Sequence, residues 1–573
     1  MSPRWILAIG ADTGGRRQIE TRAGQWGLVN RCETRGFTLL ADLTLPVPAD
    51  GVAGLAVVGR LFGSQDFSAV GRLGDEAASA IAGDPASVLR DRYWGGYVAA
   101  VCDSASGETR LLRDPSGAVP VYWAKLPSLW IVSGDARLLC DVIETRIAID
   151  YTSLAARLFF PGHHGARTCL AGVTELLPGE MLTIGRSASA SCWWRPSDHV
   201  RDLGMDASAL EAVIDRTVHA LAGRHHRIVL TVSGGLDSSI LASSLAGQPC
   251  PVDLLTVASR DPRGDERGYA GMLARSLGRP LASRWYDHGG IDVRLPSVEH
   301  PPWPGARTFA QGYDRLRQAH ARALGADAIF SGDGGDNVFG LTMSAAPVID
   351  RLMAEGPRAA MASAADIARL TGVGIPAVWR SVAGRMLRRG RGMWREDAAF
   401  LTPGAVRLAR RLPFHPWLEE SRGLPPGKRA HIASLVRAQR YAEGYARGPA
   451  EAVLPLLAQP IVEACLSIPR WRWCEGGENR AVARRAFAGR LPEAIVHRRS
   501  KGGPDAFCVE IVERNRAGIR AHLLDGLLVR EGLVDGASAE ASIACGEAER
   551  GDVHRILALV DAEAWARHWS GAG

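Results

Sequence analysis

The chain of 573 residues has very little lysine, no closely paired cysteines and no long apolar run. Only three of its 68 basic residues are lysines, namely Lys125, Lys428 and Lys501, and the other 65 are arginines. None of the ten cysteines forms a CxxC pair, which argues against a zinc ribbon and a thioredoxin-type site. No apolar window of about 20 residues occurs, so no membrane-spanning helix is expected. The N-terminal MSPRWILAIGAD has too short an apolar run for a signal peptide, and we expect a cytoplasmic protein.

The overall composition is that of a globular protein, with 46% hydrophobic and 23% charged residues. The length predicts two or three domains. A net charge of +7 is mild and does not call for a nucleic-acid partner. The charge is concentrated, because Arg380–Arg447 contains 15 basic and 5 acidic residues, a surplus of +10. This segment is either a solvated helical surface or a docking surface for a peptide, a partner protein or nucleic acid.

Two patterns of predicted structure divide the chain. Residues 1–200 alternate short apolar stretches with Gly, Pro and Asp turns, which indicates a β-rich domain. From about residue 205, strands alternate with helices, which predicts a parallel α/β sheet. Residues 341–573 are mainly helical in pattern. The predicted strands are Trp5–Ile9, Gly54–Val58, Tyr97–Cys102, Val119–Trp123 and Leu129–Val132, followed by His226–Val232, Val252–Ala258 and Ala326–Phe330.

A glycine-rich loop, SGGLDSS at residues 233–239, lies between a predicted buried strand and a predicted helix. Its glycines allow a tight turn close to an anion, and the helix N-terminus adds partial positive charge. Ser233, Ser238 and Ser239 supply hydroxyl donors for phosphate. Asp237 fits a Mg²⁺ ligand, because a carboxylate without a cation would repel phosphate. The alternative is an ordinary glycine turn in which Asp237 caps the helix.

A second acidic loop, SGDGGDN at residues 331–337, follows the third predicted strand of the sheet. Ligands bind at the carboxyl ends of parallel strands, so Asp237 and Asp336 could share one Mg²⁺. A third motif, RRSKGG at residues 498–503, keeps a lysine in a chain that otherwise uses arginine. Lys501 would supply a compact charge to a phosphate or an oxyanion.

Together these motifs resemble the asparagine synthetase family. SGGLDSS is similar to its pyrophosphate loop, and SGDGGDNVFG to its second ATP-site motif. RDPSGAVP at 113–120, followed by SGD at 133–135, is similar to the signature of its N-terminal domain. GVTELLPGEMLTI at 172–184 is similar to its join to the synthetase half. The resemblance implies an N-terminal Ntn-hydrolase-like sandwich over residues 1–200. It implies an ATP-pyrophosphatase domain with a parallel sheet and a largely helical C-terminal part over residues 205–573.

The N-terminal domain departs from the glutamine-dependent members of that family. Their nucleophilic cysteine follows the initiator methionine, where this chain has Ser2. Their HRGPD and NGEIYN motifs are missing, and GRLFG at 59–63 stands in the second region. We therefore expect an inactive glutaminase-like domain and an amine supplied by the substrate itself.

The C-terminal motifs resemble the lasso peptide cyclases, an amide-forming branch of the family. They are PLLAQPIVE at 455–463, GGENRAVAR at 476–484 and RRSKG at 498–502. Carried over, Lys501 matches the catalytic lysine, Asp237 and Asp336 match the Mg²⁺ ligands, and Asp333 is our candidate general base. The implied ATP-binding residues are Ser233, Gly234, Gly235, Asp237, Ser238, Ser239, Val257, Ser331 and Gly332.

The resemblance implies ATP and Mg²⁺ as cofactors and a precursor peptide as substrate. An Asp or Glu side chain would be adenylated, and the peptide N-terminal amine would then close a macrolactam. A leader peptidase and a leader-recognition protein are the implied partners, with no nucleic acid and no membrane. The alternatives are an asparagine synthetase that uses free ammonia, a β-lactam synthetase, a tRNA-modifying enzyme with a similar loop, and an inert scaffold.

Overall fold

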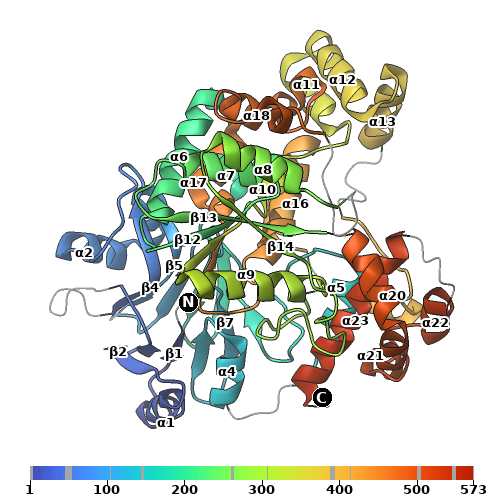
Figure 1. Cartoon of the computed structure of the whole chain (residues 1–573). Helices are drawn as coiled ribbons and strands as arrows, with labels where there is room; N and C mark the ends of the chain where they lie inside the picture. Colours follow the sequence, from blue (N-terminus) through green and yellow to red (C-terminus); the bar gives the residue numbers. More distant parts are fainter. Residues whose placement is uncertain are drawn as a thin grey trace.

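The structure is a computed structural model with three β-sheets and a large helical part (Figure 1). It describes residues 4–45, 54–103, 105–143, 148–259, 264–305, 307–387, 394–412, 414–499, 505–544 and 550–571. Within these ranges, every helix is too short or too polar to cross a bilayer.

The N-terminal part is a sandwich of two antiparallel sheets. The first has the order β2-β3-β1-β8-β7-β9 and the second the order β11-β10-β6-β5-β4. The strands are β1 Trp5–Ile9, β2 Val29–Glu33, β3 Phe37–Ala41, β4 Leu55–Gly63, β5 Tyr93–Cys102, β6 Thr109–Arg113, β7 Tyr122–Lys125, β8 Trp130–Ser133, β9 Thr174–Glu175, β10 Glu180–Ile184 and β11 Ala188–Cys192. The helices are α1 Thr13–Gly24, α2 Asp75–Gly83, α3 Pro85–Arg92, α4 Ala136–Ile143 and α5 Tyr151–Phe159.

Alternating side chains form the core between these sheets. Trp5, Leu7 and Ile9 of β1 point to one face and pack with Val58 and Val98 of the opposite sheet. The prediction of a strand at Trp5–Ile9 is confirmed, as is the β-rich character of this region. The five helices of this region have no counterpart among the elements predicted from the sequence.

A buried ion cluster supports the sandwich. Arg113 donates to Glu175 over 2.8 Å, and the His164 ring lies 2.9 Å from the other carboxylate oxygen of Glu175. Both Arg113 and Glu175 are about 2% exposed. Burial alone would raise the pKa of Glu175, but His164 and Arg113 outweigh it and hold that pKa at about 2. The signature residue Arg113 therefore has a structural role.

We expect Glu175→Gln to lower the free energy of unfolding by about 3–5 kcal/mol, because it leaves the Arg113 charge buried without its partner. The folded-state pKa of Glu175 is below its unfolded value. The advantage of the wild type is therefore present above pH 4.5 and lost as the pH falls toward about 2. Chemical denaturation at several pH values measures this. Glu33→Gln, on the exposed surface of β2, is the control and should change stability by less than about 0.5 kcal/mol. An equal loss in both variants would contradict the prediction.

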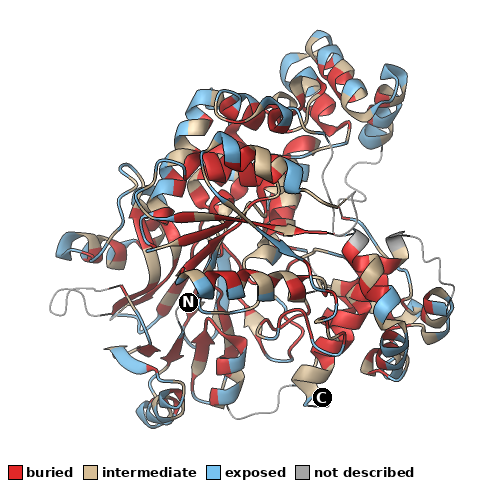
Figure 2. Cartoon of the chain, in the orientation of Figure 1, coloured by how far each residue is buried: buried red, intermediate tan, exposed pale blue. Residues whose placement is uncertain are grey.

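The third sheet is fully parallel, with the order β14-β13-β12-β15-β16. Its apolar strands are buried on both faces, as Figure 2 shows. Helices α6, α7 and α8 lie over one face and α9 over the other (Figure 1). The strands are β12 Ile228–Thr231, β13 Val252–Ala258, β14 Leu281–Trp285, β15 Ala328–Phe330 and β16 Glu451–Val453. The helices are α6 Ala207–Ala222, α7 Leu236–Ser244, α8 Arg267–Ser276 and α9 Ala310–Leu324.

The remainder is helical, which confirms the predicted α/β part with a mainly helical C-terminal part. Its α-helices are α10 Gly335–Val338, α11 Ala346–Glu355, α12 Pro357–Thr371, α13 Ile375–Leu387, α14 Pro403–Ala409, α15 Pro416–Glu420, α16 Pro426–Ala438, α17 Gln459–Ser467, α18 Ala481–Phe487, α19 Glu493–Val496, α20 Asp505–Leu524, α21 Leu527–Arg530, α22 Gly536–Ala544 and α23 Arg550–Ser570. Short 3-10 turns lie between elements of this part, at Ser421–Gly423, Gln439–Tyr441, Pro455–Leu457 and Arg470–Gly477, and another, Pro196–His199, lies between β11 and α6.

Candidate functional site

The glycine-rich loop joins β12 to α7, as the sequence predicts. Gly234 has a φ of +64°, and a Cβ there would lie 2.3 Å from the Cβ of Tyr269, so only glycine fits. Gly235 is the N-cap of α7 and has no side chain to accept from the first helical turn. The N-terminus of α7 is therefore suited to an external anion.

The serines of the loop lie around the same turn. Ser238 accepts from the backbone N–H of Ser233 over 3.3 Å. Ser239 is fully buried, and its hydroxyl has no partner in the described part of the chain. Val257 lies near the carboxyl end of the neighbouring strand β13 and is partly buried.

The structure brings the second motif against the first. A Cβ on Gly332 would lie 2.7 Å from the backbone nitrogen of Ser238, and a Cβ on Gly335 would lie 2.6 Å from the Cγ of Asp237. Ser331 donates its N–H to Val453 of β16, which fixes the start of the loop. Both loops follow adjacent parallel strands, β12 and β15, as the predicted sheet requires.

The two carboxylates proposed as Mg²⁺ ligands contact the same guanidinium nitrogen. Nη1 of Arg480 lies 3.0 and 3.1 Å from the oxygens of Asp237 and 2.6 Å from Asp336. Arg480 is 9% exposed and has a left-handed backbone, with a φ of 56°. A cationic group thus lies between Asp237 and Asp336.

Such a pair of carboxylates fits Mg²⁺, which usually takes one or two protein carboxylates and completes its shell with water and phosphate oxygens. Across the described ranges, no three or more His, Cys, Asp and Glu side chains cluster as a complete metal site. Because the Arg480 guanidinium already lies between the two carboxylates, it would have to move away before a metal ion could bind both of them. The Mg²⁺ roles of Asp237 and Asp336 stay predictions.

Replacing Arg480 should make the stability of the protein depend on Mg²⁺. Arg480→Gln leaves two neighbouring carboxylates without their shared cation, so we expect unfolding without divalent cations to become easier by about 3 kcal/mol. Added Mg²⁺ should restore part of this loss, because binding to the folded state stabilises it. Chemical denaturation with EDTA and with Mg²⁺ measures both effects. Arg485→Gln on the same helix, where Arg485 pairs with Glu475, is the control. Equal stabilisation of Arg480→Gln and the wild type by Mg²⁺ would contradict the expectation.

Asp333, the candidate general base, is held by a tyrosine and near two arginines. The Tyr445 hydroxyl donates to its Oδ2. Burial would raise the pKa of Asp333, but Arg307, the Tyr445 hydrogen bond and Arg317 outweigh it and keep the pKa below its usual value. Asp333 is therefore ionised at neutral pH, and its general-base role stays a prediction.

The third motif also meets the glycine-rich loop. Nη1 of Arg498 donates to the carbonyl of Ser233 over 3.2 Å, and its Nη2 contacts Glu266 over 2.7 Å. Lys501 lies outside the described residues, and its catalytic role stays a prediction. Arg480, Tyr445 and Arg498 were not predicted as site residues. Arg480 and Arg498 stand inside quoted motifs, whereas Tyr445 has no sequence signal.

In the described part of the arginine-rich segment Arg380–Arg447, several cationic side chains are paired or buried. Arg447 pairs with Asp135 of the sandwich, and Arg410 with Glu396. The Lys428 ammonium group is buried and donates to the carbonyls of Leu466 and Ile468. Burial lowers the pKa of Lys428 to about 8. Part of the +10 charge is therefore used inside the protein, and the docking role of the remainder stays a prediction.

Comparisons with known proteins identify the family. The asparagine synthase family matches residues 209–567, more than half of the chain. A search of curated proteins gave no match. The matching solved structures include the allosteric regulatory enzyme of purine biosynthesis and a glutamine phosphoribosylpyrophosphate amidotransferase from B. subtilis complexed with ADP and GMP, each 11% identical. They cover 52% and 57% of this chain and 76% and 90% of their own, with TM-scores of 0.20 and 0.21. The family match places this chain in the asparagine synthase family.

Proposed function

We propose that the protein is an ATP-dependent lasso peptide cyclase. It adenylates an Asp or Glu side chain of a precursor peptide and joins that side chain to the peptide N-terminal amine as an isopeptide macrolactam. AMP and pyrophosphate are the other products. ATP-dependent amide-bond formation is the general chemistry that the family match supports.

One observation carries the chemical part of this proposal. The two motif loops meet at the carboxyl ends of β12 and β15. There Asp237 and Asp336 both contact the Arg480 guanidinium, and the N-terminus of α7 lies beside them. A backbone turn suited to phosphate and carboxylates suited to a metal ion are the groups that an enzyme needs to activate a carboxylate with ATP. The cyclase subtype depends on the C-terminal motifs of the sequence.

One of those motifs lies at the junction with the sandwich. Glu463, the last residue of PLLAQPIVE, accepts from the Trp194 indole over 2.7 Å and from Gln459 over 2.9 Å. In the proposed enzyme the sandwich is an inactive glutaminase-like domain, and this contact joins it to the ligase part, residues 205–573.

The residues of the chain bind and orient the reactants. The N-terminus of α7 and Ser233, Ser238 and Ser239 bind the polyphosphate of ATP. Mg²⁺, when bound by Asp237 and Asp336, neutralises charge on the phosphate oxygens. The peptide carboxylate oxygen attacks the α-phosphorus, and the bond to pyrophosphate breaks. The amine nitrogen then attacks the acyl carbon, its proton leaves, and the bond to AMP breaks.

The test combines the protein, Mg²⁺·ATP and candidate precursor peptides that begin at the mature N-terminus. The expected product has lost the mass of one water, with AMP and pyrophosphate formed in equal amounts. Formation of asparagine from aspartate and ammonia instead would overturn the cyclase proposal. So would cyclisation of a small amino diacid in place of the peptide. A leader peptidase and a leader-recognition protein are the partners that this proposal requires.

A further inference from the structure

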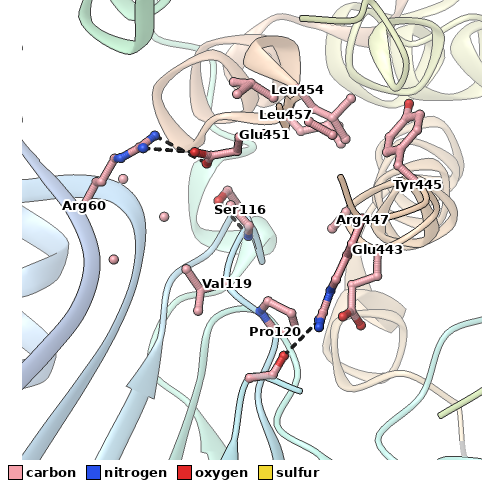
Figure 3. A pocket seen from close by; sticks show the side chains of 18 of the residues that line it. Arg60, Ser116, Val119, Pro120, Glu443, Tyr445, Arg447, Glu451, Leu454 and Leu457 are labelled. Atoms are coloured by element: carbon pink, nitrogen blue, oxygen red, sulfur yellow. Dashed lines mark hydrogen bonds and ion pairs between the residues drawn. The ribbon is translucent and has the colours of Figure 1, made fainter. Parts of the chain in front are cut away.

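The sandwich and the ligase part meet along a seam that contains two cavities. The larger, of about 360 Å³, is lined by β4, β5 and residues 116–120 of the sandwich and by residues 442–458 of the ligase part (Figure 3). The smaller, of about 10 Å³, lies where Arg113 and Glu175 of the sandwich approach Gln439 and Glu443. The two parts are therefore not packed tightly together along the whole seam.

Two ion pairs cross the seam beside the larger cavity. Arg60 of the sandwich donates to Glu451 over 3.3 and 2.9 Å, as Figure 3 shows. Arg447 of the ligase part pairs with Asp135 of the sandwich. The contact between the two parts therefore depends in part on which carboxylate each arginine takes as its partner.

Glu443 is a carboxyl group of the seam that has no hydrogen-bond partner in the described residues. The residue is 6% exposed, and both of its carboxylate oxygens are fully buried. The smaller cavity beside it has room for one water molecule at most, so an ionised carboxylate there would lack a hydration shell. Burial accordingly raises the pKa of Glu443 to about 7, although Arg447 and Arg113 act to lower it. Glu443 is therefore neutral in this arrangement at mildly acidic pH.

Arg447 is the cation that an ionised Glu443 can take. In Figure 3 the guanidinium of Arg447 lies beside the carboxyl group of Glu443, and the charge of Arg447 acts on that carboxyl group. The Arg447 side chain is about one third exposed and lines the larger cavity, so it has room to turn. Glu443 and Arg447 belong to the same segment of the ligase part. A pair between them would not cross the seam, and Asp135 would lose its partner.

The other charged and titratable groups around Glu443 keep their state over the same pH range. The carboxylate of Glu175 holds Arg113 and has a pKa of about 2, so this pair persists above that pH. Burial lowers the pKa of His300 and of His415 well below 6.5, so both rings stay neutral. The groups that face Glu443 are, from the sandwich, Arg113, Asp135, His164 and Glu175, and, from the ligase part, His300, His415 and Arg447.

We propose that Glu443 is a proton-sensitive switch of the seam: when it is protonated, Arg447 stays with Asp135, and when it is ionised, it takes Arg447 from Asp135 and the seam loosens. Such a device needs one charge change and one element with two arrangements, here the Arg447 side chain. The proposal goes beyond the proposed function and depends on neither ATP nor peptide.

Hydrogen exchange of the full chain tests the proposal, with uptake corrected for the pH dependence of intrinsic exchange. Residues 113–120 and 439–448 should lose about tenfold in protection between about pH 6 and about pH 8.5, because opening the seam releases the proton more easily at the higher pH. Strand β12 is the internal control and should not change. In Glu443→Gln, which cannot ionise, protection of both segments should differ by less than about threefold between the two pH values.

Glu451→Gln is the matched control, because it breaks the other pair across the seam without adding a titratable group. It should lower protection of the two segments by the same factor at both pH values. Equal protection of the wild-type seam at the two pH values would overturn the proposal, as would the same pH-dependent loss in Glu443→Gln.

Thermal unfolding gives a second readout. The folded-state pKa of Glu443 is above its ordinary value of 4.5, so its contribution is fully present below pH 4.5 and is lost as the pH rises through 7. Glu443→Gln should therefore melt at a higher temperature than the wild type at about pH 8.5, with no such advantage at about pH 4.5. Burial also raises the pKa of Asp114 to about 6 and of Glu180 to about 7, but both groups titrate equally in the two proteins. Equal melting temperatures at about pH 8.5 would overturn the proposal.

Discussion

A Lys501→Ala variant is expected to bind peptide with little change and to lose ring formation by at least about 10³-fold. The resemblance gives Lys501 the catalytic position, and Arg498 supplies structural support. The Arg498 side chain, in the same motif as Lys501, donates to the carbonyl of Ser233 in the glycine-rich loop. In the proposed reaction the Lys501 ammonium group would neutralise charge on the phosphate and on the tetrahedral oxyanion.

The measurement is product formation by mass spectrometry, together with peptide affinity from a separate titration. Lys125→Ala is the matched control, because the Lys125 ammonium group lies over the Trp130 ring of the sandwich, on a strand that contributes nothing to the motif loops. It should retain wild-type activity. Lys501→Arg tests whether a compact charge is needed rather than positive charge alone. Normal yield from Lys501→Ala would remove the catalytic assignment.

Those parts of the site that follow from the succession of strands, loops and helices along the chain could be predicted from the sequence. SGGLDSS and SGDGGDN each follow a buried strand, and parallel strands bring their carboxyl ends to one edge, so the meeting of Asp237 and Asp336 follows from the predicted sheet. Arg480 could not be placed in this way. It lies more than 140 residues from either carboxylate in sequence, and only the packing of α18 brings it between them.

Two further features depend on tertiary structure alone. Strand β16 has only three residues and is followed at once by Leu454 and Pro455, yet Glu451–Val453 completes the edge of the parallel sheet because β15 offers it a partner. A cavity beside it is lined by segments hundreds of residues apart in sequence, from β4 and β5 of the sandwich and from residues 442–458, so only the folded chain brings its walls together.

The structure gives a reason why one of the three lysines is a lysine and not an arginine. Lys428 donates to two carbonyls at the end of α17 from a buried position, where a compact ammonium group fits and a planar guanidinium would need more space. Lys125 has no comparable constraint. The buried site of Lys428 therefore requires a lysine. The same difference between lysine and arginine is the reason to test Lys501.

An Asp237→Asn variant is expected to lower the rate of pyrophosphate release by about 10²–10³-fold at limiting Mg²⁺. The substitution keeps the shape of the side chain and removes one of the two carboxylates that a metal ion could use. Arg480 would still pair with Asp336, so the remaining site offers a metal ion one negative charge and a competing cation. Excess Mg²⁺ should therefore restore part of the rate, because the variant binds metal weakly rather than folding poorly.

The control is Asp253→Asn. Asp253 pairs with Arg227 at the amino end of β13, opposite the edge that carries the motif loops, and should tolerate the change with a rate within about twofold of the wild type. The rate is measured against Mg²⁺ concentration for both variants, with the melting temperature as a check on folding. A wild-type Mg²⁺ dependence in Asp237→Asn would show that Asp237 does not hold the metal ion. In that case the metal ion of the reaction would be held by Asp336, phosphate oxygens and water.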